Sequence, residues 1–325
     1  MKIAINGFGR IGRSFFKQAL GNPNFEIVAI NDLGNFENLK YLLKYDTVYR
    51  GFNNPIPESI KLLQEPDPTK LPWGELGVDV VIESTGVFDD YKKAKVHLTS
   101  GAKKVLITAP AKGNEGVDGR IILLGLNDSE VKNFNIISNG SCTTNAISSV
   151  LAILNEKLGI KKAILNTTHA YTATQELIDG SVKNDFLRGR AGAQNIIPSS
   201  TGAAKTISKV IPELENKFDG IAMRVPVICG SIADVTFVSA RPTTVEEINQ
   251  ILTSASQEEK WKKLLVTSTE PLVSSDILQS NIPAIIDLSL TRVVDGDLVK
   301  ILSWYDNEWA YSHTLILQLL NMLKP

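Results

Sequence analysis

The first 141 residues alternate between two hydrophobic patterns. Short apolar runs at Ile3–Ile5 and Ile27–Ile30 predict buried strands. Each run is followed by apolar residues at helical spacing, in Ile11–Leu20 and Phe36–Lys44, which predict amphipathic helices. Strands that alternate with helices predict an α/β unit, a doubly wound parallel sheet with helices on both faces. The alternation continues with a strand, a helix and a strand at Val78–Ile82, Tyr91–Leu98 and Val105–Thr108.

The pattern changes after Cys142. Ser231–Ala240 and Leu298–Trp304 are longer runs separated by long connections, which predicts a second α+β domain on a mixed or antiparallel sheet. Glu308–Leu323 carries apolar residues on one side and predicts an amphipathic helix. Asp179–Ser200 shows neither period. A loop of this length is either functional or evidence of a missed element, and we favour a functional loop.

Composition narrows the functional classes. With 325 residues, 43% hydrophobic, and a formal net charge of -1, the sequence predicts a soluble two-domain chain that favours neither nucleic acid nor an anionic membrane. Two cysteines cannot form a disulfide framework, so free thiols in a reducing compartment, the cytoplasm, are expected. The first residues lack the pattern of a secretory signal, and no stretch is apolar enough to span a bilayer. No metal site is expected.

A glycine motif lies between the first predicted strand and helix. Gly7, Gly9 and Gly12 fit G-x-G-x-x-G, and a second strand ends in Asp32, twenty residues after Gly12. In a Rossmann-type sheet these glycines permit a tight turn, close approach to a pyrophosphate at a helix N-terminus, and close helix packing. Asp32 would accept hydrogen bonds from ribose hydroxyls and repel a 2′-phosphate, which predicts NAD rather than NADP. The alternative is a structural turn with a capping aspartate.

The stretch S-N-G-S-C-T-T-N-A places Cys142 among hydroxyl and amide side chains. Apolar residues at helical spacing follow from Ala146 to Leu158, so Ser141–Asn145 is predicted to form the capped first turn of a helix. A helix N-terminus stabilises a thiolate, which predicts a lowered pKa for the Cys142 thiol. Inert packing is the alternative, and it is our interpretation of Cys229.

His169 follows a predicted strand, Ala163–Thr168, in the sequence H-A-Y-T. A single histidine is more often structural than catalytic, but an imidazole is the usual partner that activates a cysteine nucleophile. With a nicotinamide cofactor nearby, the pair predicts addition of the thiol to an aldehyde, hydride transfer from the hemithioacetal, and release of an acyl thioester.

Seven motifs in order along the chain resemble those of phosphorylating glyceraldehyde-3-phosphate dehydrogenases: G-F-G-R-I-G-R, E-S-T-G-V-F, S-C-T-T-N, H-A-Y-T-A-T-Q, N-I-I-P-S-S-T-G-A-A-K, R-V-P-V and W-Y-D-N-E-W. The resemblance implies reversible oxidation of glyceraldehyde 3-phosphate with NAD and phosphate to 1,3-bisphosphoglycerate, in glycolysis or gluconeogenesis. It also implies an NAD-binding domain at residues 1–141 plus a C-terminal helix at 307–325, and a catalytic domain at 142–306. A homotetramer is implied, with the Asp179–Ser200 loop against a neighbour's cofactor site.

The resemblance also implies individual roles. Cys142 would be the nucleophile, and His169 the base that activates it and takes the hemithioacetal proton. Two phosphate sites are implied: the substrate phosphate at Thr172 and Arg224, and the attacking phosphate at Ser141, Thr143, Thr201 and Gly202. The implied cofactor contacts are Arg10 and Ile11 at the pyrophosphate, Asp32 at the ribose, Thr85 and Thr108 in the nucleotide cleft, and Asn307 and Tyr311 at the nicotinamide.

Each phosphate or nicotinamide residue also has a structural interpretation when it is taken singly. These are helix caps for Ser141 and Thr143, a turn for Thr201–Gly202, a surface ion pair for Arg224 and core packing for Tyr311. Two other functions compete for the whole chain. Erythrose-4-phosphate dehydrogenase hydrolyses its thioester, and the Thr201–Gly202 set with H-A-Y-T-A-T-Q argues against it. A non-catalytic nucleotide-sensing protein would have a disabled site, which the complete cysteine–histidine pair argues against.

The chain departs from the family pattern at several positions. Ala146 replaces a second cysteine, which removes an internal partner for oxidised Cys142. Phe52–Pro68 is shorter than the usual segment, and its E-P-D-P sequence has proline where a basic residue often lies beside the adenosine. Gly180–Ser181 replaces the leucine–proline pair of many strictly NAD-dependent members, which weakens the predicted exclusion of NADP.

Overall fold

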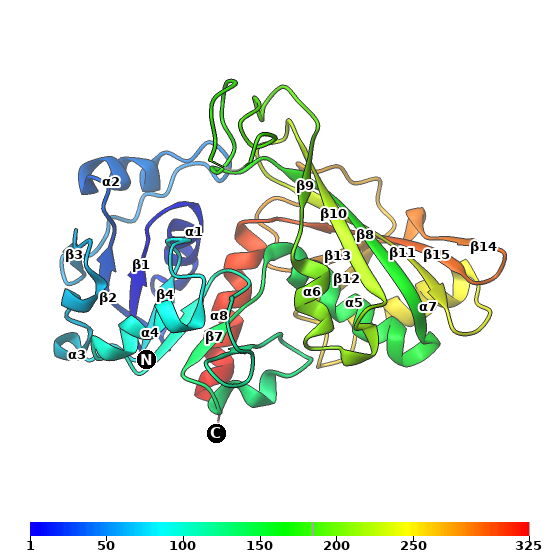
Figure 1. Cartoon of the computed structure of the whole chain (residues 1–325), viewed down its shortest axis with the longest axis horizontal. Helices are drawn as coiled ribbons and strands as arrows, with labels where there is room; N and C mark the ends of the chain where they lie inside the picture. The colour runs from blue at the N-terminus through cyan, green and yellow to red at the C-terminus, as the bar shows by residue number, and fades with distance from the viewer. Residues whose placement is uncertain (184, 325) are drawn as a thin grey trace. The chain divides into compact units, whose positions relative to one another are not determined.

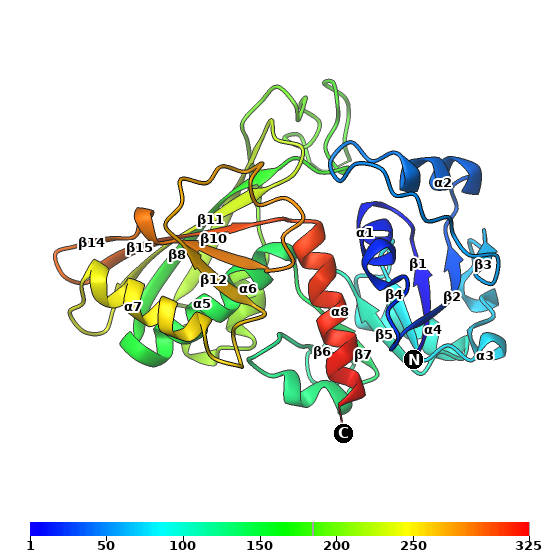
Figure 2. The same cartoon turned by 180° about the vertical axis from the view of Figure 1, so that it is seen from behind.

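The computed structural model describes residues 1–183 and 185–324 and divides into two compact units (Figure 1 and Figure 2). The first contains Met1–Ser141 and the chain from Ser312 onward, and the second contains Cys142–Tyr311. Residues 307–311 therefore fold with the second unit, although the resemblance placed them with the first. The reason is local, because the Asn307 side-chain oxygen accepts hydrogen bonds from Gly230 N at 2.9 Å and Ser231 Oγ at 3.1 Å.

The first unit is built on a seven-stranded parallel sheet with the order β3-β2-β1-β4-β5-β7-β6. The chain order reverses between β1 and β4, and a doubly wound sheet binds ligands at the carboxyl ends of the strands at such a point. The predicted fold class is confirmed for this unit. The strands are β1 (Lys2–Asn6), β2 (Glu26–Asn31), β3 (Lys61–Leu63), β4 (Val80–Glu83), β5 (Lys104–Ile107), β6 (Arg120–Ile121) and β7 (Ile136–Ser138).

Side-chain caps begin two helices of the first unit. The Asn35 side chain accepts from the Asn38 N–H at the start of α2, and Asp90 accepts from the Lys92 N–H at the start of α4. The helices are α1 (Arg10–Ala19), α2 (Phe36–Lys44), α3 (Trp73–Leu76) and α4 (Tyr91–Thr99), with 3₁₀ turns η1 (Pro68–Lys70) and η2 (Asp128–Lys132). The last helix, α8 (Trp309–Leu323), belongs to this unit from Ser312 onward.

The second unit contains an eight-stranded mixed sheet with the order β12-β13-β15-β11-β8-β10-β9, and β14 pairs with β15. β8 lies parallel to β10 and antiparallel to β11. This agrees with the mixed sheet predicted for the second domain. The strands are β8 (Ile160–Ala170), β9 (Ile197–Ser200), β10 (Phe218–Val225), β11 (Ser231–Ser239), β12 (Leu265–Ser268), β13 (Ala284–Asp287), β14 (Arg292–Val294) and β15 (Leu298–Tyr305).

Helix α5 (Cys142–Leu158) is buried along most of its length and contacts β8, β11, β13 and β15 of this sheet. Residues alternate between the two faces of a strand, so Leu165 is buried whereas Ile164 on the same strand is exposed. Ile221 on β10 is exposed as well. The other helical segments are α6 (Ala203–Ser208), α7 (Val245–Ser256), η3 (Pro212–Leu214) and η4 (Leu288–Leu290).

The predicted helices and strands agree with the structure to within a few residues, and Phe36–Lys44 is helix α2 as predicted. The unassigned stretch Asp179–Ser200 differs at its end, where Ile197–Ser200 forms edge strand β9. An edge strand tolerates Pro198, which cannot donate to a ladder on both sides. The described residues before β9 form turns and bends, and position 184 lies outside the described residues. No helix in the described ranges is long and apolar enough to cross a membrane.

Candidate nucleotide pocket and cysteine–histidine site

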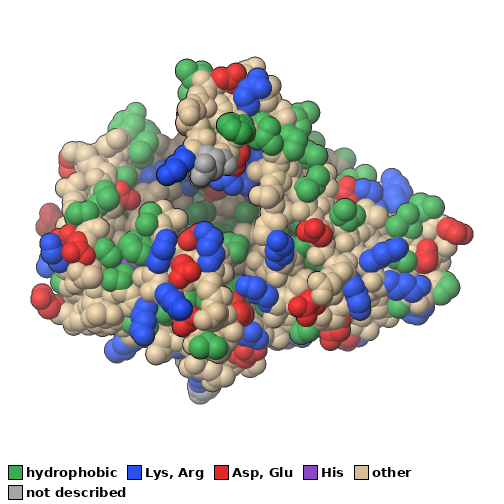
Figure 3. All heavy atoms as spheres, in the orientation of Figure 1, with side chains coloured by type: hydrophobic (Ala, Val, Ile, Leu, Met, Phe, Trp, Pro, Cys, Tyr) green, Lys and Arg blue, Asp and Glu red, His purple; other side chains and the backbone are tan. Residues whose placement is uncertain are grey.

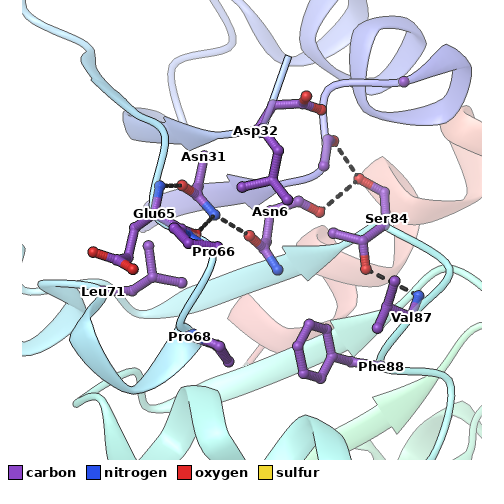
Figure 4. A pocket seen from close by; sticks show the side chains of 14 residues that line it. Asn6, Asn31, Asp32, Glu65, Pro66, Pro68, Leu71, Ser84, Val87 and Phe88 are labelled. Carbon is purple, nitrogen blue, oxygen red and sulfur yellow. Dashed lines mark hydrogen bonds between the residues drawn. The ribbon is translucent and has the colours of Figure 1, made fainter.

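A cavity of about 370 Å³ lies in the first unit at the carboxyl ends of β1, β2 and β4 (Figure 4). Its size is within the range of small-molecule pockets. The charged residues that line it are Asp32 and Glu65, both acidic. The full lining is Asn6, Gly7, Gly9, Asn31, Asp32, Leu33, Glu65, Pro66, Pro68, Leu71, Ser84, Thr85, Val87 and Phe88.

The glycine loop has the geometry that the motif predicts. Gly7 has φ +94°, and a Cβ there would lie 2.7 Å from the Ser84 carbonyl carbon. A Cβ on Gly12 would lie 2.1 Å from the Gly7 carbonyl oxygen, so a larger residue would push α1 away from the loop. A Cβ on Gly9 would meet nothing within 4 Å. The backbone at Gly9 therefore faces the open space that a pyrophosphate requires.

Asp32 follows β2 directly and lines the pocket. Its Oδ2 accepts from the Phe8 N–H at 2.6 Å, and its Oδ1 accepts from the Gly34 N–H at 2.7 Å. Each carboxylate oxygen has a second lone pair, so both can accept a further hydrogen bond from a ribose hydroxyl. The carboxylate is thus fixed beside the glycine loop, as Figure 4 shows.

Only some of the other predicted cofactor residues in the first unit line the pocket. Thr85 lines the pocket, whereas Arg10, Ile11 and Thr108 are absent from its lining. The Arg10 guanidinium forms an ion pair with Asp46, with Nη1 2.9 Å from Oδ2. Arg10 is therefore tied to the protein at the start of α1.

Cys142 and His169 meet in the second unit. Cys142 is the first residue of α5, His169 is next to last in β8, and Sγ lies 3.4 Å from Nε2. Arg224 on β10 is the register partner of His169. Its Nη1 lies 2.5 Å from His169 Nδ1 and donates to the Ala170 carbonyl oxygen at 3.0 Å. Three predicted site residues from three elements thus form one cluster.

The ring of His169 is oriented by the backbone. Nδ1 lies 2.7 Å from the Ala170 carbonyl oxygen, which can only accept, and 2.5 Å from Arg224 Nη1, which can only donate, so the two contacts favour opposite tautomers. We assign the ring proton to Nδ1, where it donates to the carbonyl, because a base that acts on Cys142 needs its lone pair on Nε2. Nε2 then presents its lone pair to the thiol. Burial, with the charge of Arg224 as the second cause, lowers the pKa of His169 to about 3. The imidazole is therefore neutral at neutral pH and can accept a proton.

The prediction of a low thiol pKa is wrong for this structure. Burial raises the pKa of Cys142 above its usual value, and the opposing charge of Arg224 and hydrogen bonds from Thr143 do not outweigh it. The helix N-terminus is present, because α5 begins at Cys142, but desolvation of the thiolate is the larger effect. The geometry favours a neutral thiol beside a neutral imidazole, so His169 can act as a general base during attack.

We expect Cys142 to react with limiting iodoacetamide before Cys229. Cys142 is half-buried, whereas Cys229 is 2% exposed and its thiol donates to Asp306 Oδ1 at 3.4 Å. Because burial raises the pKa of Cys142, the labelling rate should rise from about pH 7 to about pH 10 as the thiolate forms. Mass mapping identifies the labelled residue, with Cys142→Ser as the control. Initial label on Cys229, or a rate already constant at about pH 7, would contradict this assignment.

Tyr305 is a member of the cluster that the sequence analysis did not single out. Its hydroxyl hydrogen-bonds with Thr143 Oγ1 at 2.9 Å and Thr167 Oγ1 at 2.7 Å. Its ring packs edge-on against His169, with the ring centroids 5.9 Å apart. The W-Y-D-N-E-W motif contains this residue, but an aromatic in a strand is first interpreted as core. The Thr143 hydroxyl, a predicted phosphate ligand, is thus engaged by Tyr305.

Two phosphate candidates border the cluster along the chain. Ser141 directly precedes Cys142 and is the last residue of the first unit in its N-terminal segment. Thr172 follows β8, and its hydroxyl lies 3.1 Å from that of Thr174, which the sequence analysis did not select. Ser141 is thus next to Cys142 in sequence, and Thr172 is three residues after His169.

Thr201 and Gly202 are not brought to Arg224. β9 pairs antiparallel with β10 so that Ile197 lies opposite Arg224. Thr201 is four positions beyond Ile197, which corresponds to about 13 Å along a strand. The Thr201 hydroxyl accepts from the Ala203 N–H at 3.2 Å at the start of α6, as the turn interpretation requires.

The two nicotinamide candidates are buried. The side-chain oxygen of Asn307 accepts from the backbone of Gly230 and the hydroxyl of Ser231, which leaves its amide N–H groups as donors. Tyr311 is buried on α8, in agreement with the core-packing interpretation.

Comparison with known proteins identifies the family. Residues 1–91 match the family model of the glyceraldehyde 3-phosphate dehydrogenase NAD binding domain, and residues 141–307 match the model of the glyceraldehyde 3-phosphate dehydrogenase C-terminal domain. The chain belongs to the glyceraldehyde 3-phosphate dehydrogenase family. The resemblance seen in the motifs is thereby confirmed.

Individual glyceraldehyde-3-phosphate dehydrogenases match along nearly their whole length. The chain is 46% identical to the protein of Thermotoga maritima, and the match covers 99% of both chains. It is 44% identical to those of Geobacillus stearothermophilus and Streptomyces coelicolor, with 97% of this chain and 96% of each relative covered.

The two family models coincide with the two candidate sites. Every residue that lines the nucleotide pocket lies between Asn6 and Phe88, inside the matched NAD binding domain. Cys142, His169 and Arg224 lie inside the matched C-terminal domain of the glyceraldehyde 3-phosphate dehydrogenase family. The prediction of an NAD-dependent dehydrogenase is confirmed.

Proposed function

We propose that this chain oxidises glyceraldehyde 3-phosphate reversibly, with NAD and inorganic phosphate, to 1,3-bisphosphoglycerate through a thioester on Cys142. The observation that carries the proposal is the 3.4 Å approach of Cys142 Sγ to His169 Nε2. Membership of the glyceraldehyde 3-phosphate dehydrogenase family supports the substrate and a role in glycolysis or gluconeogenesis.

Cys142 and His169 carry the proton transfers. The sulfur bonds to the aldehyde carbon while Nε2 accepts the thiol proton and passes it to the aldehyde oxygen, which gives a hemithioacetal. Because the pKa of His169 is lowered to about 3, the imidazolium is a stronger acid than usual and gives this proton up readily to the aldehyde oxygen. NAD, when bound, accepts a hydride from the hemithioacetal carbon. Nε2 takes the hydroxyl proton as that C–H bond breaks, which leaves a thioester.

Phosphate then releases the product. One phosphate oxygen adds to the thioester carbon, the C–S bond breaks, and the Cys142 sulfur takes the proton back from His169. We assign Arg224 and Thr172 to the substrate phosphate because the guanidinium adds positive charge to the cluster. Ser141 and Thr143 flank the nucleophile and are assigned to the attacking phosphate. The assignment of Thr201 and Gly202 to the same phosphate rests on the family resemblance alone.

The first-unit pocket has the features that the adenosine and pyrophosphate parts of NAD need. The Gly9 backbone faces open space, and Asp32 has lone pairs for ribose hydroxyls. Thr85 lines the same cavity. The remaining cofactor assignments rest on the resemblance: Arg10 and Ile11 at the pyrophosphate, Thr108 in the nucleotide cleft, and Asn307 and Tyr311 at the nicotinamide.

We expect kcat/KM to be at least about tenfold higher with NAD than with NADP, which corresponds to about 1.4 kcal/mol. The charged residues of the pocket lining are acidic, so a 2′-phosphate would meet repulsion and no paired cation there. Asp32→Asn should lower the ratio of the two kcat/KM values, whereas Asp219→Asn, at an exposed carboxylate on β10 in the second unit, should leave it unchanged. Comparable kcat/KM values in the wild type would mean that Gly180–Ser181 outweighs Asp32.

The phosphate dependence of NADH formation tests the reaction itself. Glyceraldehyde 3-phosphate and NAD should give one burst of NADH per site without phosphate and continuous turnover with it. Continuous turnover without phosphate would indicate hydrolysis of the thioester, as in erythrose-4-phosphate dehydrogenase. The absence of a burst would indicate the non-catalytic alternative.

The proposal also includes that the protein forms a homotetramer and that it lies in the cytoplasm. The loop after β8 carries exposed apolar residues at Leu177, Ile178 and Phe186, the last 92% exposed, and Figure 3 shows hydrophobic side chains on this loop at the top of the view. Apolar groups gathered on one loop favour burial in an assembly. The two cysteines are free thiols, which supports a reducing compartment. Sedimentation of the purified protein measures the assembly, and a monomer would contradict it.

A further inference from the structure

A buried carboxylate lies behind the nucleotide pocket. Glu83, at the end of β4, is 2% exposed and does not line the cavity. Its Oε2 accepts from Asn6 Nδ2 at 2.7 Å and lies 2.9 Å from His97 Nε2. Its Oε1 accepts from the Thr85 N–H at 2.9 Å and from the Thr85 hydroxyl at 2.5 Å. Four donors thus converge on one carboxylate.

His97 on α4 is anchored from behind. Trp73 Nε1 donates to His97 Nδ1 at 3.2 Å, so Nδ1 carries the lone pair and Nε2–H donates to Glu83. Both side chains are completely buried. The His97 ring also packs edge-on against Phe88, with centroids 5.5 Å apart. His97 therefore supports Glu83 and Phe88 together.

The same chain of hydrogen bonds continues along the floor of the pocket. Asn31 Nδ2 donates to Asn6 Oδ1 at 2.8 Å, and Asn31 Oδ1 accepts from the Glu65 N–H at 2.9 Å, as Figure 4 shows. Asn6, Asn31, Glu65 and Thr85 all line the cavity. Four segments of the pocket, at the ends of β1 and β2 and in the loops after β3 and β4, are joined through Glu83.

We propose that Glu83 and His97 are positioning residues for NAD, which hold Thr85 and Phe88 in the arrangement that the cofactor needs. This inference rests on the proposed placement of NAD in the first-unit pocket. A ligand site is precise when the side chains behind it fix those that line it, and a pre-organised site loses less free energy on binding. Without the His97 N–H, the buried carboxylate would lose one of its four donors and could turn away from Thr85.

The test compares two buried residues of helix α4. His97→Phe removes the hydrogen bond to Glu83, and Tyr91→Phe removes a hydrogen bond from a fully buried hydroxyl to Glu115 Oε2, at 2.9 Å, away from the pocket. We expect both variants to melt at lower temperature. His97→Phe should raise the Kd for NAD about tenfold, and Tyr91→Phe should leave it within about twofold. In steady state, the KM for NAD in His97→Phe should rise more than kcat falls.

Calorimetric titration of each variant with NAD gives the decisive comparison. An unchanged Kd in His97→Phe, or an equal increase in Tyr91→Phe, would overturn the inference. If His97→Phe does not fold, Trp73→Phe takes its place, because it removes the indole N–H that donates to His97 Nδ1. Trp73→Phe should raise the Kd for NAD about threefold, and an unchanged Kd in this variant would also overturn the inference. Asp32→Asn separates the two proposals. If Asp32→Asn raises the Kd for NAD and His97→Phe does not, only the positioning role fails. If Asp32→Asn leaves the Kd for NAD unchanged, the assignment of NAD to this pocket fails.

Discussion

Replacing His169 by asparagine is expected to lower kcat for glyceraldehyde 3-phosphate by about 10²–10⁴-fold. Nε2 lies 3.4 Å from the Cys142 sulfur, and in the proposed mechanism it accepts a proton both in the addition of the thiol and in the hydride-transfer step. Asparagine can still donate to the Ala170 carbonyl oxygen, but it offers no basic nitrogen. The NADH burst and the steady-state rate should both fall. The Kd for NAD should stay nearly unchanged, because the glycine loop and Asp32 are intact.

The pH profile of the wild type checks the same assignment. Burial and Arg224 lower the pKa of His169 to about 3, so the fraction of neutral imidazole stays constant as the pH falls from about 8 to about 5. An ordinary histidine would instead be protonated below about pH 6.5 and lose its function as a base. A kcat within about twofold of the wild type for His169→Asn would remove His169 from the base role. A wild-type acid limb near pH 6.5 that the variant lacks would contradict the lowered pKa.

Arg224→Ala is expected to lower kcat/KM for glyceraldehyde 3-phosphate by about ten- to 150-fold, because each hydrogen bond to a charged group contributes about 1.5–3 kcal/mol. Unphosphorylated glyceraldehyde has no phosphate to lose and should be affected much less at neutral pH. Both aldehydes need Cys142 and His169, so the comparison separates loss of recognition from general damage. Equal losses would mean that Arg224 is structural and that the substrate phosphate binds elsewhere.

The contact between Arg224 and His169 adds a second readout. The charge of Arg224 is one of the causes that lower the pKa of His169, so its removal should raise that pKa. The acid limb for glyceraldehyde should therefore move to higher pH in Arg224→Ala. Arg241→Ala is the matched control, because Arg241 forms an exposed ion pair with Glu247 at 2.6 Å and should leave both substrates unaffected. An acid limb that does not move would show that burial alone sets the pKa of His169.

The features that the sequence by itself determined are local. Gly7 adopts φ +94° directly after β1, and α5 begins at Cys142, both as the spacing predicts. A turn needs a residue that tolerates positive φ, and a helix needs apolar residues at its own period, so the determinants lie within a few positions. The motif order also indicated the family. The end of the Asp179–Ser200 stretch was missed because strand β9 exists only by pairing with β10.

Tertiary structure alone decided how the site residues act on each other. Arg224 lies against His169, 55 positions away in sequence, because the parallel register of β8 and β10 pairs them. The helix N-terminus predicted a low pKa for Cys142, but burial, which many distant residues create together, raises it. Glu83 and His97 gain a role behind the pocket only when β1, β4 and α4 come together. Distances between remote residues and the loss of water around a charge depend on the packed chain, and local spacing does not encode them.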